Sequence, residues 1–107
     1  MTSYDNMRDR TASSQLGGHL PFAPVAWTSR ADRIDRDGPD LLYRQVADDI
    51  ADMVKSGELP RGSRLPAEHE LMDIYAVSRP TVRSAVAELS KAGVVTVVRG
   101  RGTYVTR

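Results

Sequence analysis

The pattern of apolar and polar residues divides the chain near residue 41. Residues 1–40 contain three prolines and the polar run SSQLGGH, and their apolar residues follow neither a helical nor a strand period over any useful length. We therefore expect a disordered tail over 1–40 and a folded domain over 41–107. On this interpretation, removal of about the first 35 residues leaves the fold intact and changes the melting temperature only slightly.

The first periodic segment is LLYRQVADDIADMVKSGEL. Its apolar residues at 42, 46, 50, 53 and 54 recur at i, i+4, i+8, i+11 and i+12, which places them on one side of a helix. Gly57 ends this helix. The next segment, LPRGSRLP, predicts turns around a short extended piece at Arg64 and Leu65, because a residue before a proline favours extended geometry.

Two further helices follow in close succession. The first, PAEHELMDIYA, has Pro66 in its first turn and buries Leu71, Ile74 and Tyr75. After a short turn, Ser78 is the N-cap of the next helix, and Gly93 ends it with a left-handed residue. Pro80 falls in the first turn of this helix, and its inward residues are 82, 85, 86 and 89. Two helices joined so closely form a helix-turn-helix pattern.

The chain ends in a pattern typical of a β-hairpin. The β-branched run from Val94 to Val98 and a second strand from Thr103 to Val105 are joined by RGRG, which supplies glycines for the turn and two arginines at its tip. The predicted fold is α+β: a winged helix-turn-helix of three helices, a short strand and a C-terminal β-hairpin wing.

Composition excludes several classes of function. The chain has 107 residues and no cysteine, so it has room for one small core and offers no disulfide or Cys-based zinc site. His19 and His69 lack the spacing of metal ligands, so we expect neither a metal nor a cofactor. The sequence also has no apolar run long enough for a membrane span and no signal peptide.

Charge is distributed unevenly along the chain. Residues 1–40 carry five arginines against six aspartates, and residues 41–75 carry four basic against seven acidic groups. Residues 76–107 carry six basic groups against Glu88 alone, a net charge of +5. This asymmetry indicates a surface for a polyanion near the C-terminal end, although a solvated basic face would give the same pattern.

With these elements placed, residues 43–105 resemble the winged helix-turn-helix domain of the GntR family of bacterial transcription regulators. The matching motifs are YRQV (43–46), SGEL (56–59), RLPAEHEL (64–71), VSRPTVR (77–83) and RGRGTYV (99–105). The resemblance implies a cytoplasmic, nucleoid-associated protein that binds specific double-stranded DNA, and we expect a repressor. In similar proteins the third helix enters the major groove and the wing reaches the minor groove. The DNA-binding residues expected here are Ala67, His69, Ser78, Arg79, Pro80, Thr81, Arg83, Ser84, Lys91, Arg99, Gly100, Arg101, Gly102 and Thr103.

The chain departs from the family pattern in two ways that matter. His69 stands where the second helix often carries an arginine, and a neutral imidazole lacks the two-pronged guanidinium that contacts bases. The C-terminal domain with which family members normally bind an effector and dimerise is also missing, so the sequence is either a short DNA-binding protein or a fragment. We expect a monomer or weak homodimer that pairs on a two-fold operator.

Two alternative functions remain open at the sequence level. The first is a protein-interaction module, or an accessory regulator without its own operator, in which the segment HLPFAPVAW (19–27) docks on a partner; this segment fits better a tail that rests loosely on its own domain. The second is an enzyme that uses His69 with Glu68 and Glu70. Neighbouring residues on a helix point in different directions, however, so these three groups do not converge on one substrate.

Overall fold

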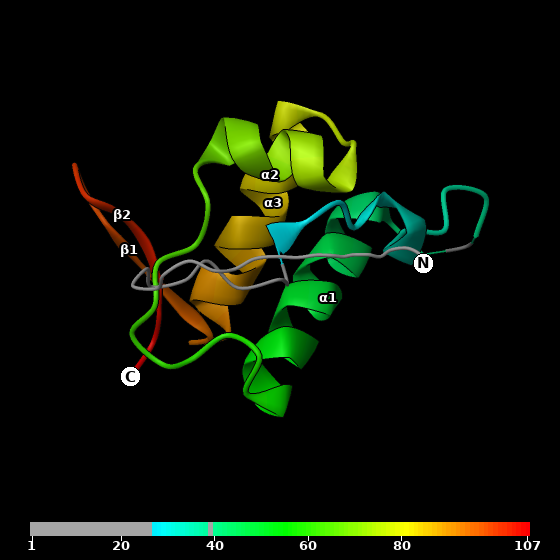
Figure 1. The fold of residues 1–107 in the computed structure, drawn as a ribbon. Coiled ribbons are helices and arrows are strands. Elements are labelled where there is room, and N and C mark those ends of the chain that lie inside the picture. Colours follow the sequence, from blue (N-terminus) through cyan, green and yellow to red (C-terminus); the bar gives the residue numbers. More distant parts are fainter. Residues whose placement is uncertain (1–26, 39) are drawn as a thin grey trace, which may run out of the picture.

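The computed structural model describes residues 27–38 and 40–107. Three α-helices and a hairpin follow a short 3₁₀ helix, and Figure 1 shows how they are arranged. In chain order these elements are η3 (Ala31–Arg33), α1 (Leu42–Ser56), α2 (Glu68–Tyr75), α3 (Arg79–Lys91), β1 (Val95–Val98) and β2 (Gly102–Val105). The predicted winged helix-turn-helix is confirmed.

A single apolar core lies between the three helices and the base of the hairpin. The most extensive contact between elements joins α1 to α3, and α2 also packs on α3. The side chains predicted to face inward from α1 and α3 are buried at Val46, Ile50, Met53, Val82 and Leu89. Four further residues predicted to face inward lie partly exposed at the edge of this core: Leu42, Val54, Ile74 and Val86.

The hairpin is tied to the domain on one side by the residues that precede α2. β1 and β2 pair antiparallel, with Val95 opposite Val105 and Val97 opposite Thr103. The backbone N–H of Leu65 donates to the carbonyl of Thr103 at 2.8 Å. The predicted short strand is therefore present only as an isolated bridge between Arg64 and Tyr104.

The start of α2 differs from the prediction. The helix begins at Glu68, so Pro66 precedes it and does not occupy its first turn. Ala67 is extended, with φ −64° and ψ 162°, and its N–H donates to the Glu70 carboxylate at 2.7 Å. Because this side chain satisfies the backbone at Ala67, the helix starts two residues later than the proline suggested.

The turn between α2 and α3 is very short. Ala76 has a positive φ of 55°, and the Val77 N–H donates back to the carbonyl of Met72 at 3.1 Å. Ser78 occupies the predicted N-cap position, but its side chain makes no capping hydrogen bond. Its hydroxyl instead lies 3.1 Å from that of Thr81. The predicted left-handed glycine after α3 is confirmed, with φ 80° at Gly93, and Gly57, predicted to end α1, is also left-handed, with φ 87°.

Part of the segment assigned to the tail is packed on the domain. Residues 30–36, here called the strap, run across α1 and α2 (Figure 1). Ile34 belongs to the core and is 7% exposed, and the Arg30 N–H donates to the Ile74 carbonyl at 2.8 Å. Trp27 also packs against the core. The packed unit therefore begins before residue 41. Residues 1–26, including most of the segment 19–27, lie outside the described part of the chain.

A buried ion pair fastens the strap to α1 and α2. The guanidinium of Arg30 donates to both carboxylate oxygens of Asp49, at 2.6 and 3.1 Å, and the Tyr75 hydroxyl donates to the same carboxylate at 2.7 Å. Burial raises the pKa of Asp49, but the hydrogen bonds from Arg30 and Tyr75 outweigh it, so the pKa lies below its ordinary value. Arg36 donates to the last carbonyl of α2, that of Tyr75, at 2.9 Å.

Among the described residues we searched for membrane-spanning helices and for clusters of metal-binding side chains, and found neither. None of the described helices is long and apolar enough to cross a membrane. Within residues 27–38 and 40–107, no three His, Asp or Glu side chains are grouped so that they could hold a metal ion.

Candidate nucleic-acid interface

The outer face of α3 presents a row of basic and small side chains to solvent. Burial of Val82 and Ala85 against the other helices fixes the rotation of α3 and turns Arg79 and Arg83 outward. Their side chains are 50% and 68% exposed. Ser84 and Lys91 are exposed on the same helix, and Thr81 is partly exposed.

Both arginines of α3 meet one carboxylate on α2. The Glu68 oxygens accept from Arg83 Nε at 2.7 Å and from Arg79 Nη1. These hydrogen bonds, the one from Arg83 above all, lower the pKa of Glu68 below its ordinary value. Glu68 therefore stays ionised near neutral pH and holds the two guanidinium groups beside each other. Sequence reasoning missed this role, because Glu68 lies 11 and 15 residues before its partners.

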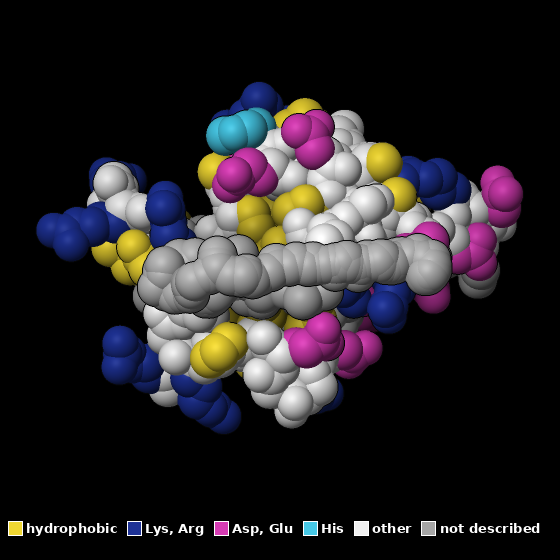
Figure 2. Space-filling view, in the orientation of Figure 1, with side chains coloured by type: hydrophobic (Ala, Val, Ile, Leu, Met, Phe, Trp, Pro, Cys, Tyr) yellow, Lys and Arg dark blue, Asp and Glu magenta, His cyan; other side chains and the backbone are white. Residues whose placement is uncertain are grey.

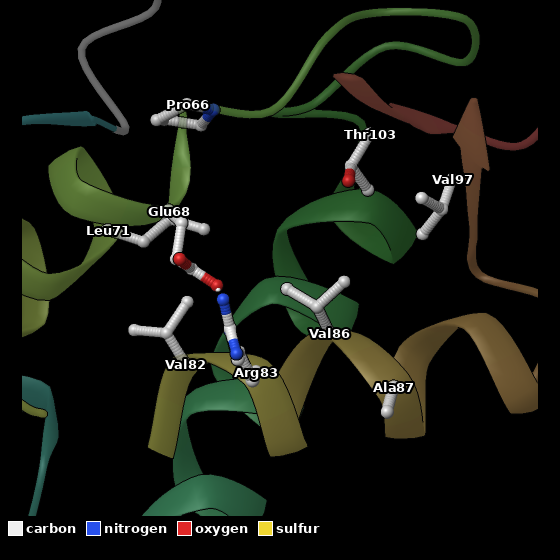
Figure 3. A pocket seen from close by; sticks show the side chains of 9 residues that line it. All are labelled: Pro66, Glu68, Leu71, Val82, Arg83, Val86, Ala87, Val97 and Thr103. Carbon is white, nitrogen blue, oxygen red and sulfur yellow. Dashed lines mark hydrogen bonds and ion pairs between the residues drawn. The ribbon is translucent and has the colours of Figure 1, made fainter. Parts of the chain in front are cut away.

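A groove separates α3 from the hairpin. Its volume is about 330 Å³, and Figure 3 shows Glu68 and Arg83 joined across one end of it. Val86 and Ala87 lie on the α3 side, and Val97 and Thr103 face them from the hairpin. The predicted site residues thus form two separate groups, one on α3 and one at the hairpin, with this mainly apolar groove between them.

The tip of the hairpin has the conformation that its glycines allow. Gly100 has φ 78° and Gly102 has φ 135°, values that side-chain-bearing residues rarely adopt. Between them the Arg101 N–H donates to the Val98 carbonyl at 2.9 Å, which closes the turn and leaves Arg99 and Arg101 exposed. In Figure 2 basic side chains without acidic neighbours lie at the end of the molecule that carries the hairpin.

The remaining predicted residues surround these two groups. Ala67 is the half-buried N-cap of α2, and His69 is exposed at the second position of that helix, next to Glu68. Ser78 and Pro80 are exposed where α3 begins. All of these residues lie near the N-terminal ends of α2 and α3, which are the positive ends of the two helix dipoles.

Comparison with known proteins agrees with this arrangement. The family model "Bacterial regulatory proteins, gntR family" matches residues 42–105. The chain belongs to this family. The mannosyl-D-glycerate transport/metabolism system repressor MngR of Escherichia coli is 44% identical over 68 residues, which cover 64% of this chain and 28% of that protein. The match to a Bacillus subtilis regulator, YcbG, likewise covers only 31% of the relative, so the chain spans about a third of the length of such proteins.

Two solved structures of gntR-type proteins share the fold. YtrA from Sulfolobus acidocaldarius, a GntR-family transcription factor, has a TM-score of 0.65 and 32% identity, over 69% of this chain and 78% of that one. The DNA-binding domain of AraR in complex with operator ORX1 has a TM-score of 0.61 and 32% identity, over 68% and 94% of the two chains.

Proposed function

We propose that this chain binds specific double-stranded DNA and acts in transcription regulation, as a repressor. The observation that carries the proposal is the pair of exposed arginines on α3, which Glu68 holds side by side on a face that the core leaves uncovered. The similarity to a repressor and to an operator-bound domain supports it. Such a role implies a location at the bacterial nucleoid, in the cytoplasm.

In this proposal α3 lies in the major groove. Arg83 is one turn inside the helix, where a guanidinium can donate two hydrogen bonds to a guanine edge. Arg79 stands at the first position of the helix and contacts either a base or a phosphate. Thr81, Ser84 and Lys91 hold the flanking phosphates, and His69 approaches the same strand from α2.

The hairpin supplies the second contact, at the minor groove. Arg99 and Arg101 project from its tip, and Gly100 between them has open space where a side chain would be, which lets the backbone approach the DNA closely; Gly102 and Thr103 adjoin this contact. Charge at such a tip attracts phosphates with little regard to sequence. We therefore assign discrimination between sequences to α3 and general affinity to the hairpin.

The proposed assembly on DNA concerns the unit that the structure describes, residues 27–38 and 40–107. A unit of this size offers little area for a stable interface between free copies. We propose that two copies bind a two-fold operator, each with its own α3, and that they pair weakly or not at all without DNA.

An electrophoretic shift experiment tests the function directly. The probe is the DNA upstream of the protein's own gene, and unlabelled operator and scrambled duplexes serve as competitors. We expect a shifted complex that unlabelled operator displaces and scrambled duplex displaces poorly. The logarithm of its association constant should fall linearly with the logarithm of the salt concentration. Equal competition by both duplexes would contradict sequence-specific binding. An affinity independent of salt would contradict DNA binding itself.

A further inference from the structure

We propose that Arg64, which lies outside both groups of site residues, is a third DNA-contacting cation at the hairpin tip. This inference rests on the proposed DNA-binding function and extends it to a residue in the segment before α2. It predicts that Arg64 neutralises a DNA phosphate beside the minor groove, together with Arg99 and Arg101.

The backbone places Arg64 on the outer face of the hairpin, away from α3. Arg64 is bridged to Tyr104, whereas the next residue, Leu65, bonds to Thr103 and is buried. Successive side chains of an extended segment point to opposite faces. Arg64 therefore shares a face with Tyr104 and is exposed, while Leu65 points into the core.

Along that face the Arg64 side chain reaches toward the hairpin tip. A Cβ atom at Gly102 would lie 2.7 Å from Arg64 Nε and 3.2 Å from its Nη2, so the guanidinium lies directly over the place where Gly102 has no side chain. Gly102 immediately follows Arg101. Its missing side chain thus has two consequences: the backbone adopts φ 135°, and space is left for the Arg64 guanidinium beside the tip.

Arg64 thus brings a third arginine to the tip that carries Arg99 and Arg101. The described residues provide ion pairs for Arg30, Arg79 and Arg83, and none for Arg64, Arg99 or Arg101. Like charges placed together repel one another, and an anion that binds among them relieves this repulsion. A DNA backbone supplies such an anion at every phosphate, and a planar guanidinium can donate two hydrogen bonds to it.

Arg107 provides a matched control at the opposite end of the hairpin. It is exposed, and its guanidinium also lies over a glycine with positive φ: a Cβ at Gly62 would lie 3.1 Å from Arg107 Nε. Among the described residues it has no ion pair either. Arg64 and Arg107 thus share charge, exposure and packing, and differ in that only Arg64 lies at the tip.

The experiment measures binding of each variant to a fluorescent mixed-sequence duplex by anisotropy, at salt concentrations from about 50 to 200 mM. One lost phosphate contact lowers the slope of log K against log salt by about 0.9, which corresponds to about eight-fold weaker binding at 100 mM salt. We expect this change for Arg64→Ala and no change for Arg107→Ala. We expect Arg64→Lys to keep the slope, because it keeps the cation.

The outcomes separate this inference from the function beneath it. If the unaltered protein shows no salt-dependent binding, DNA binding itself fails. If the unaltered protein binds with a normal slope while Arg64→Ala keeps that slope, only the role of Arg64 is overturned. Equal losses in the alanine variants of Arg64 and Arg107 would also overturn it, since the effect would then be net charge. If Arg64→Lys loses as much slope as Arg64→Ala and both variants melt earlier, Arg64 supports the hairpin and does not contact DNA.

Discussion

The Arg30–Asp49 pair and the cluster of Glu68 with Arg79 and Arg83 use the same two chemical groups in different surroundings. The side chains of Arg30 and Asp49 are 9% and 12% exposed, and a tyrosine hydroxyl donates to the same carboxylate. The cluster on α2 and α3 is 31–68% exposed. A buried pair is costly to break, whereas an exposed pair contributes little to stability and can exchange partners. The first network therefore holds the fold, and the second leaves the arginines available to another anion.

The largest expected effect is on the buried side, from removal of the strap. Deletion of residues 1–35 removes both Ile34 and the partner of Asp49, whereas deletion of residues 1–26 keeps them. We expect the longer deletion to be less stable than the shorter one by roughly 4 kcal/mol, from lost apolar burial and a broken ion pair. Chemical denaturation of the two proteins measures this difference. Equal midpoints would restore the sequence-based expectation of a dispensable tail.

A smaller loss is expected from one substitution in the same network. Arg30→Ala leaves Asp49 with only the Tyr75 hydroxyl as a hydrogen-bond donor among the described residues and should lower the free energy of unfolding by about 3 kcal/mol at pH 7. Arg33→Ala, an exposed arginine of the same strap, is the control and should change it by less than about 0.5 kcal/mol. Similar losses in the two variants would mean that net charge, and not the buried pair, is responsible.

The same network gives a pH dependence of known sign. The folded pKa of Asp49 is lowered, so its ionised form stabilises the protein above the pKa of an unfolded aspartate, about 3.9. That contribution is lost as the pH falls through the lower, folded pKa. The stability difference between the unaltered protein and Arg30→Ala should therefore be full at neutral pH and shrink below about pH 4. A difference that grows on acidification would reverse this assignment.

The contrast between the two networks also separates what the sequence reveals from what it hides. α1, α3 and the hairpin follow from local signals: the repeat of apolar residues, the left-handed glycines and the β-branched run around RGRG. The strap gave no such signal, because Ile34 is a single apolar residue among charged ones and its neighbours in space come from distant segments. From the sequence, Glu68 enters only beside His69 and Glu70 in the enzyme alternative. Its contacts depend on how α2 crosses α3, which no local pattern specifies.

Among the exposed residues, the arginines of α3 and those of the hairpin tip should contribute differently to DNA binding: the first to sequence preference and the second to general affinity. Arg83→Ala should weaken binding to the operator by about 1–3 kcal/mol and relax preference at one base pair. Arg101→Ala should weaken operator and scrambled duplexes alike and reduce the salt slope by about one. Competition titrations with both duplexes distinguish these results. If Arg83→Ala keeps full discrimination, α3 is not the element that reads the sequence.

The smallest effect on stability is expected from Glu68→Ala. This variant also tests most directly whether the exposed cluster serves DNA binding and not the fold. Glu68→Ala removes an exposed carboxylate, so the melting temperature should hardly change. Two opposite effects on DNA binding follow. Loss of one negative charge near the DNA should raise the affinity for scrambled duplex several-fold at low salt. Loss of the acceptor that holds Arg79 and Arg83 together should reduce the advantage of the operator over scrambled DNA.

Glu70→Gln is a suitable control, since it removes a nearby charge and keeps an oxygen that can accept from the Ala67 N–H. It should raise general affinity without loss of discrimination. If Glu68→Ala also leaves discrimination intact, the carboxylate only repels DNA, and the arginines of α3 need no partner to orient them.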